Sequence, residues 1–179
     1  MPRYVAFLRG INLGNRRIKM DALRGHFEAL PELSSVATFI ASGNVIFDCE
    51  ARDGGRLERR IEDHLQKRLG YPVDTFIRSI EEVEAIPALD LFDSAPGPDH
   101  GVHVVFLRNP PDAETVARLR ALETDGDAFR VAGREAFWLR KGRLTDSEVR
   151  AADLDRALGG VSSTMRNMNT VRRLVARYA

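Results

Sequence analysis

The sequence predicts an α+β fold made of two similar ferredoxin-like subdomains in tandem, with an extra helix at the C-terminus. Three observations predict it. A strand-like segment near the N-terminus recurs about halfway along the chain, and a glycine-centred hairpin pattern follows each copy. Apolar residues with helical spacing come before and after each hairpin. Each half therefore has the order β-α-β-β-α-β, which is the ferredoxin-like arrangement.

The first repeated element is an apolar strand. Residues 5–9 read Val-Ala-Phe-Leu-Arg, and residues 104–108 read Val-Val-Phe-Leu-Arg. Loop-forming residues follow both copies. Almost continuous apolar runs of this kind are typical of strands that are buried on both faces, so we expect these strands at the centre of each sheet.

The second repeated element is a hairpin. Residues 39–47 and 129–137 each begin and end with Phe and have a Gly at the centre, as a tight turn between two strands requires. Helices and closing strands surround the hairpins. In the first half we expect helices over 20–30, 56–69 and 80–86 and a strand over 73–77. In the second half we expect helices over 112–122 and from 147, a weaker strand over 161–165, and the final helix over 169–177.

Residues 87–98, between the halves, contain three prolines and a glycine, which favours a connector over a regular element. We predict a first subdomain over 1–90, a connector over 91–101, a second subdomain over 102–166, and a C-terminal helix over 167–179.

Composition indicates a soluble cytoplasmic protein. Hydrophobic residues make up 44% and charged residues 30% of 179 residues, which are ordinary values for a globular domain. No apolar run is long enough to cross a membrane, so we expect no membrane partner. The N-terminus leads directly into a strand-like run, which argues against a signal peptide. The single cysteine, Cys49, has no partner in the chain and favours a reducing compartment.

Charge is unevenly distributed although the net charge is only +1. Residues 1–20 contain five Arg or Lys and no acid, and residues 166–179 contain four Arg and no acid. Basic ends on a chain that is acidic between them would attract an anion if the ends meet. The alternative is that surface elements collect charge without a functional reason.

Three segments together resemble one known family. Residues 4–14 read Tyr-Val-Ala-Phe-Leu-Arg-Gly-Ile-Asn-Leu-Gly, residues 38–47 read Thr-Phe-Ile-Ala-Ser-Gly-Asn-Val-Ile-Phe, and residues 164–170 read Thr-Met-Arg-Asn-Met-Asn-Thr. They resemble motifs of an uncharacterised bacterial family, domain of unknown function 1697. The resemblance implies two ferredoxin-like subdomains and a C-terminal helix, and it implies no established activity. The family usually has Trp where this chain has Met168, which would weaken a ligand-stacking role but suits packing.

The first candidate site is the loop 9–19, which is longer than most strand-to-helix connections. Gly10 and Gly14 allow close approach of backbone N–H groups to a ligand. Asn12 donates and accepts hydrogen bonds, and Arg9 and Lys19 add positive charge. The loop ends at a helix start, which favours a phosphate or carboxylate. It matches neither the Walker nor the Rossmann pattern. The alternative is a solvated surface loop.

The second candidate site is the segment 166–170. Arg166 could hold an oxyanion through two parallel hydrogen bonds. Asn167, Asn169 and Thr170 crowd the same helix start, although capping requires only one side chain. The alternative is that one of the asparagines simply caps the last helix.

The third candidate site is the turn 42–44. Ser42 and Asn44 could line the same opening as Arg9. The alternative is that Ser-Gly-Asn serves the turn alone, which is the stronger interpretation of this tripeptide.

The sequence predicts no metal site and no cofactor. His100 and His103 lack suitably spaced partner ligands, and no histidine accompanies Cys49. We expect Trp138 to pack in a strand. No reaction is indicated, so catalytic residues and enzymatic activity stay unassigned.

Three functions remain open. The first is binding of an anionic small molecule at the first-half loop and the segment 166–170. The second is nucleic-acid binding, which the ferredoxin-like order allows. The first strands of both halves argue against it, because they are apolar on both faces, whereas an RNA-recognition domain exposes one face of its sheet. The third is a ligand-free assembly role. The loops of the two halves differ, so we expect any chemistry to belong to the first half. Oligomeric state is not indicated.

Overall fold

The structure is a computed structural model that describes residues 1–92 and 99–179. The central part of the predicted connector, residues 93–98, lies outside the described residues. The chain divides into two units, of which the first is Met1–Ile86 with Arg173–Ala179 and the second is Pro87–Arg172. The predicted C-terminal segment is therefore divided between the two units.

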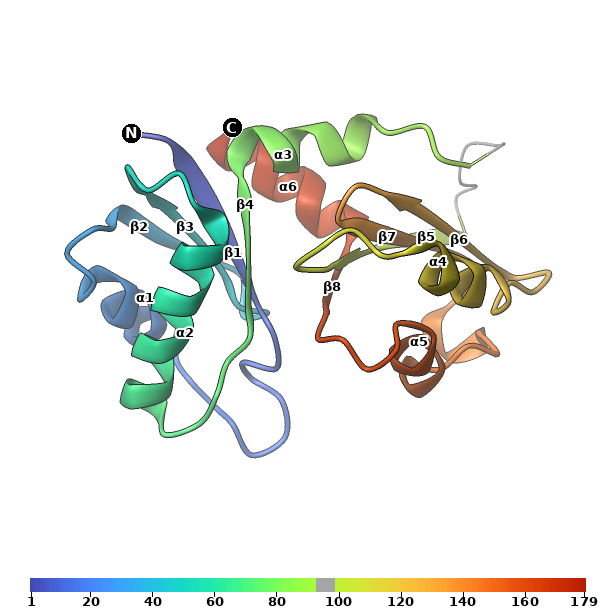
Figure 1. Cartoon of the computed structure of the whole chain (residues 1–179), viewed down its shortest axis with the longest axis horizontal. Coiled ribbons are helices and arrows are strands. Elements are labelled where there is room, and N and C mark those ends of the chain that lie inside the picture. The colour runs from blue at the N-terminus through green and yellow to red at the C-terminus, as the bar shows by residue number, and fades with distance from the viewer. Residues whose placement is uncertain (93–98) are drawn as a thin grey trace. The chain divides into compact units, whose positions relative to one another are not determined.

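The first unit is a four-stranded antiparallel sheet in the order β2-β3-β1-β4. This order and the β-α-β-β-α-β succession are ferredoxin-like, as predicted. Figure 1 shows α1 and α2 on the same side of this sheet. The elements are β1 (Arg3–Leu8), α1 (Met20–Glu28), β2 (Ser34–Phe39), β3 (Asn44–Asp48), α2 (Gly54–Leu69), β4 (Thr75–Ser79) and α3 (Ile80–Ala85), and a 3-10 turn (Ile86–Ala88) follows α3.

The core of the first unit lies between its sheet and the two helices. Ala6 and Leu8 project from β1 toward the helices, because alternate residues of a strand face opposite sides of the sheet. Leu23 and Phe27 approach them from α1, and Ile61 from α2. Full burial of the Leu, Phe and Ile side chains contributes about 1.5–3 kcal/mol each. The cluster therefore stabilises β1 and α1, the two elements that the loop 9–19 joins.

Helix α2 forms because its apolar residues recur on one face and both of its ends are capped. Leu57 and Ile61 are buried on that face. The Asp53 carboxylate accepts a hydrogen bond from the Arg56 N–H at 3.0 Å. Gly70 ends the helix in a left-handed conformation with φ +78°. The cap explains why α2 begins slightly before the predicted start at residue 56.

The second unit repeats this architecture with the sheet order β6-β7-β5-β8. The predicted duplication is thereby confirmed. In Figure 1, α4 and α5 lie on one side of this sheet. The elements are β5 (His100–Phe106), α4 (Ala113–Arg120), β6 (Asp127–Ala132), β7 (Glu135–Lys141), the 3-10 turn η2 (Leu144–Asp146), α5 (Ala151–Ala157) and β8 (Thr164–Asn167). Helix α6 (Met168–Tyr178) follows β8 and begins in this unit, and its residues from Arg173 onward belong to the first unit.

Two elements of the second unit begin later than predicted. Helix α5 starts at Ala151 rather than near Ser147. The Ser147 hydroxyl donates to the Asp127 carboxylate at 2.7 Å and accepts from the Val149 N–H at 3.0 Å, so this stretch is held as a turn. Strand β8 likewise covers Thr164–Asn167 instead of 161–165.

The equal Phe-Gly-Phe spacing of the two hairpins conceals a shift of one residue. Phe47 packs in the cluster beneath the helices of the first unit, whereas Trp138, not Phe137, occupies the corresponding cluster in the second. The loops between the paired strands also differ, because residues 40–43 connect β2 to β3 and only residues 133–134 connect β6 to β7. A one-residue shift moves a side chain to the opposite face of the sheet, which explains the exchange of Phe for Trp.

The C-terminal helix has a counterpart in the first half. Helix α3 follows β4 directly, and α6 follows β8 directly. Three apolar residues with the same spacing are buried in each helix region. Each half is thus a ferredoxin-like arrangement with a trailing helix. These residues are Ile80, Val83 and Ile86 in one half and Met168, Val171 and Leu174 in the other.

Candidate functional site

The loop 9–19 joins β1 to α1 and has the length that the sequence indicated. Gly10 and Gly14 adopt left-handed conformations with φ +66° and +59°. No heavy atom lies within 4 Å of the position that a Cβ would take at either glycine. The backbone at both positions is therefore open to an approaching group, and other residues would be strained there.

Asn12 anchors this loop at two points. Its side-chain Nδ2 donates to the carbonyl of Ala41 at 3.0 Å, and its Oδ1 accepts from the Ile18 N–H at 2.7 Å. The first bond ties the loop to the β2–β3 connection, and the second closes the loop on itself. Ile11 is buried, with 3% exposure. The loop is therefore held by specific contacts, in contrast to a loosely solvated surface loop.

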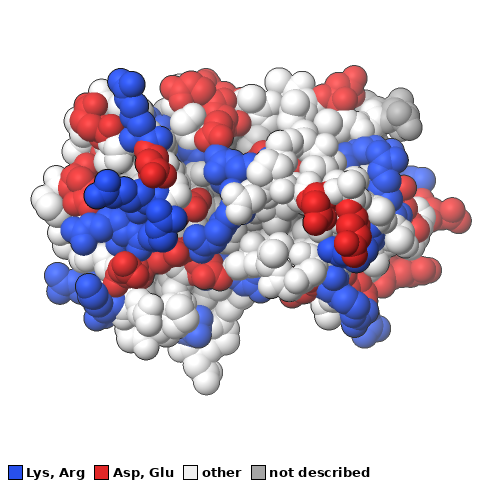
Figure 2. Space-filling view, in the orientation of Figure 1, with Lys and Arg blue, Asp and Glu red and all other residues white. Residues whose placement is uncertain are grey.

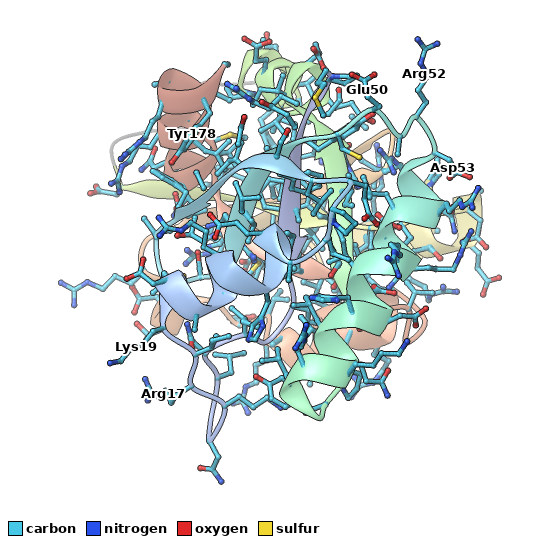
Figure 3. All side chains as sticks on the ribbon, turned by 90° about the vertical axis from the view of Figure 1, so that its left-hand side faces the viewer. Arg17, Lys19, Glu50, Arg52, Asp53 and Tyr178 are labelled. Carbon is cyan, nitrogen blue, oxygen red and sulfur yellow. The ribbon has the colours of Figure 1, made fainter. Side chains whose placement is uncertain are left out.

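The basic residues of the loop occupy different environments. The Arg16 guanidinium carbon lies 4.4 Å from the centre of the Tyr71 ring, which is a cation–π contact. Arg17 and Lys19 project from the same end of the unit in Figure 3. Lys19 stands at the N-cap position of α1, and no side chain among the described residues caps that helix start. The Arg9 backbone N–H donates to the Asp74 carbonyl at 2.9 Å.

The turn 42–44 lies directly beside the loop. Asn44 is fully buried, and its Nδ2 donates to the Phe39 carbonyl at 2.9 Å and to Ser42 Oγ at 3.0 Å. Gly43 has φ +77°, and a Cβ at this position would overlap the Ile11 side chain. The structure therefore brings the first and third predicted sites together, and it gives Ser42 and Asn44 a role in closing the hairpin.

Arg166 belongs to the second unit and lies in β8. Its exposure is only 6%, and its Nη1 donates to Thr164 Oγ1 at 2.8 Å and to the Met165 carbonyl at 2.9 Å. Burial lowers the pKa of the guanidinium to about 10, so Arg166 stays charged at neutral pH.

The remaining residues of 166–170 form the start of α6. Asn167 Oδ1 accepts from the Asn169 N–H at 2.8 Å, and Asn169 Oδ1 accepts from Arg172 at 3.2 Å. Thr170 is half-buried. Met168 is 7% exposed, which fits the packing role considered for it. Ligand binding by Asn167, Asn169 and Thr170 stays a prediction.

A second buried arginine was missed by the sequence reasoning. Arg78 lies opposite Val5 in the first sheet, and Arg166 lies opposite Val104 in the second, so they hold equivalent positions. Each donates its Nη1 to the carbonyl of the preceding residue at 2.9 Å. Aligning the last strands on the register of the first strands would have revealed this pair.

A cluster at the end of the second sheet was also missed. Arg140 is 5% exposed and its Nη2 lies 3.4 Å from His103 Nδ1. The Arg140 guanidinium carbon lies 5.5 Å from the centre of the Trp138 ring, and Gly101 leaves room beside it. Burial, and then the charge of Arg140, lower the pKa of His103 to about 4. No spacing in the sequence distinguishes this group from ordinary strand residues.

Other site chemistry is limited in the described part of the chain. Across residues 1–92 and 99–179, no group of three or more His, Cys, Asp or Glu side chains is arranged to hold a metal ion. Within the same residues, no helix combines the length and apolar character that spanning a membrane requires. Trp138 packs in the second core, as predicted, and its Nε1 donates to Asp127 at 2.8 Å.

Fold and site together define an α+β protein of two duplicated ferredoxin-like units, with an anchored Gly/Asn/Arg loop in the first. The chain belongs to the family described as protein of unknown function DUF1697, whose model matches residues 1–137. This confirms the resemblance noted in the sequence. The segment 166–170 lies beyond the matched residues.

A solved structure is similar along nearly the whole chain. The structure of conserved bacterial protein SP0830 from Streptococcus pneumoniae has a TM-score of 0.77 and 23% sequence identity, and the match covers 99% of this chain and 98% of that chain. This similarity shows the fold. No curated protein matches the chain.

Proposed function

We propose that the protein binds a small anionic molecule, carrying a phosphate or a carboxylate, at the loop 9–19 of its first unit. The observation that supports this most is the start of α1, which lacks a side-chain cap and follows Arg16, Arg17 and Lys19. Unpaired N–H groups and the helix dipole favour an anion at such an end. Gly10 and Gly14 add open backbone beside it.

The anchoring of the loop supports the proposal further. A loop held by Asn12 loses less conformational freedom when a ligand binds than a free loop would lose. Leu13 is 70% exposed and Ile40 is 38% exposed, and these apolar groups lie in the two segments that Asn12 connects. A ligand with a small apolar part beside its anionic group would suit this surface.

The segment 166–170 is the second predicted binding segment. It lies in the second unit, and we consider it separately from the loop 9–19. Asn167 and Asn169 are exposed, and Arg166 is charged at neutral pH. These groups suit a phosphate or carboxylate. No catalytic role is assigned to any of these residues. We also place the protein in the cytoplasm, because its only cysteine, Cys49, is free and buried.

The proposal is tested by thermal unfolding against sugar phosphates, nucleotides and dicarboxylates at constant ionic strength. A ligand at one hundred times its dissociation constant should add about 2.7 kcal/mol of stability. The double variant Arg17→Gln/Lys19→Gln should lose this gain. The matched control Lys67→Gln/Arg120→Gln removes the same charge from exposed positions and should keep it.

Two results would overturn the proposal. One is a panel in which no compound stabilises the wild-type protein. The other is equal loss of stabilisation in the loop variant and in the control, which would indicate a general effect of net charge. Arg166→Gln in the same panel reports separately on the second predicted segment.

No observation favours the other two functions as strongly. Phe7, Phe47 and Phe76 of the first sheet are fully buried, so these rings cannot serve as stacking platforms for bases. Salt-dependent retention of RNA on a filter would revive the nucleic-acid hypothesis. A concentration-dependent mass in light scattering would favour assembly.

A further inference from the structure

A second hollow in the first unit has the chemistry of an anion site. It has a volume of about 310 Å³ and lies between the end of β3 and the start of α2. Its lining includes three arginines, Arg52, Arg56 and Arg60, with two carboxylates, Glu32 and Asp53. Ala51 and the buried Leu57 give it an apolar floor.

The residues around this hollow are fixed in place by specific contacts. The Tyr4 hydroxyl donates to the Ala51 carbonyl at 2.7 Å, which holds the segment before α2. Asp53 caps the helix by accepting from the Arg56 N–H. Because Asp53 already caps this helix start, the positive charge at the hollow comes from the arginine side chains.

The two carboxylates are already engaged, whereas two of the cations are not. Arg60 pairs with Glu32 at 2.9 Å. Burial acts to raise the pKa of Glu32, but a backbone hydrogen bond and the bond to Arg60 together hold it below its ordinary value. Among residues 1–92 and 99–179, the guanidinium groups of Arg52 and Arg56 make no hydrogen bond and no ion pair. Figure 2 shows that Lys and Arg side chains gather over α2 on this face.

We propose that this hollow binds a phosphate monoester carried on a flat apolar group, with Arg52 and Arg56 contacting the phosphate. Guanidinium groups bind phosphate oxygens through paired hydrogen bonds, and their flat faces also stack on rings. The apolar floor formed by Leu57 and Ala51 receives the non-phosphate part. Asp53 disfavours the anion, so binding depends on both arginines acting together.

This site is separate from the proposed loop site. Figure 3 shows Arg52 and Asp53 at one end of the first unit and Arg17 and Lys19 at the other. Each site can therefore be altered without changing the residues of the other. Arg59 provides a matched control, because it is exposed on the same helix and does not line the hollow.

The test is isothermal titration calorimetry of the full-length protein with phenyl phosphate, inorganic phosphate and phenol at constant ionic strength. Phenyl phosphate should bind most tightly and phenol should not bind measurably. The double variant Arg52→Gln/Arg56→Gln should raise the dissociation constant of phenyl phosphate at least about tenfold, because the loss of even one charge-assisted hydrogen bond weakens binding by about that factor or more. Arg59→Gln should bind as the wild type does.

Three outcomes would overturn the inference. The first is no binding of phenyl phosphate to the wild-type protein. The second is equal weakening in Arg59→Gln and in the double variant. The third is binding that survives in the double variant but is lost in Arg17→Gln/Lys19→Gln, which would assign phenyl phosphate to the loop instead. Circular dichroism of each variant checks that these exposed substitutions leave the fold intact.

Discussion

At the scale of single residues, burial separates polar groups that support the fold from those that remain available. Asn44 and Asn12 look alike in the sequence, yet the first is fully buried and the second bridges two exposed segments. Arg166 is buried and donates to Thr164 and Met165 of its own strand, whereas Arg52 and Arg17 are exposed. The same residue type is therefore buried within a sheet in one place and exposed at a candidate site in another.

His103 gives a prediction about pH at this scale. Its pKa in the folded protein is about 4, below the ordinary value of 6.5, because burial and Arg140 disfavour the charged ring. Between these two values the unfolded chain binds the proton first, so the free energy of unfolding falls as the pH is lowered from 6.5 toward 4. Urea unfolding at pH 7 and pH 4.5 should show this as a loss of roughly 2–3 kcal/mol from this residue.

The variant His103→Gln isolates the contribution of His103, because the wild type and the variant share all their acidic residues and their other histidines. Between pH 7 and pH 4.5, the variant should lose roughly 2–3 kcal/mol less of its free energy of unfolding than the wild type loses. Identical pH dependence in the two proteins would show that His103 titrates normally and that the contact with Arg140 does not hold the ring neutral.

At the scale of elements, the two hairpins share the Phe-Gly-Phe spacing but differ in what surrounds their turn glycines. Gly43 and Gly133 each allow a positive φ, at +77° and +57°, in the turn of their hairpin. Only Gly43 also packs against a neighbouring segment, because the loop residue Ile11 lies where a Cβ would project. The turn in the first unit thus packs the hairpin against the candidate loop. Among the described residues, a Cβ at Gly133 would meet only the side chain of Glu135, two residues along the same hairpin.

This difference predicts unequal costs for the same substitution. Gly133→Ala should lower the free energy of unfolding by roughly 1–2 kcal/mol, from the left-handed conformation alone. Gly43→Ala should cost roughly 1–3 kcal/mol more, because its methyl group overlaps Ile11. Chemical denaturation of the two variants measures the difference. Equal costs would mean that the loop moves away without penalty, and the candidate site would then be less firmly held than proposed.

At the scale of the whole molecule, the chain returns to its first unit at its C-terminus. Residues from Arg173 onward belong to that unit. The Tyr178 carbonyl accepts from Arg3 at 3.1 Å, and the Tyr178 ring meets the Phe39 ring edge to face at 6.0 Å. The first ferredoxin-like unit is therefore completed by residues distant in sequence.

The substitution Leu174→Ala tests this completion. Leu174 is fully buried, so its truncation should cost about 2–5 kcal/mol of unfolding free energy. Amide hydrogen exchange should show the loss of protection in β1 to β4 more than in β5 to β8, because Leu174 belongs to the first unit. Ala176→Ser, at an exposed position of the same helix, is the control. Loss confined to β5 to β8 would contradict the assignment.

Local pattern was enough to predict the duplicated fold, the helix over 56–69, and the candidate segments on the loop and the turn. Periodicity and turn chemistry act between near neighbours, so they can be read from the chain itself. The register of the hairpins, the buried Arg78 and the His103–Arg140 contact depend on which distant strands pair. The same holds for the hollow beside α2 and for the return of the C-terminus to the first unit, because packing between segments far apart in sequence leaves no local signal. That is why the sequence located the loop for which anion binding is proposed, and the tertiary structure decided which of its side chains hold the fold and which remain exposed.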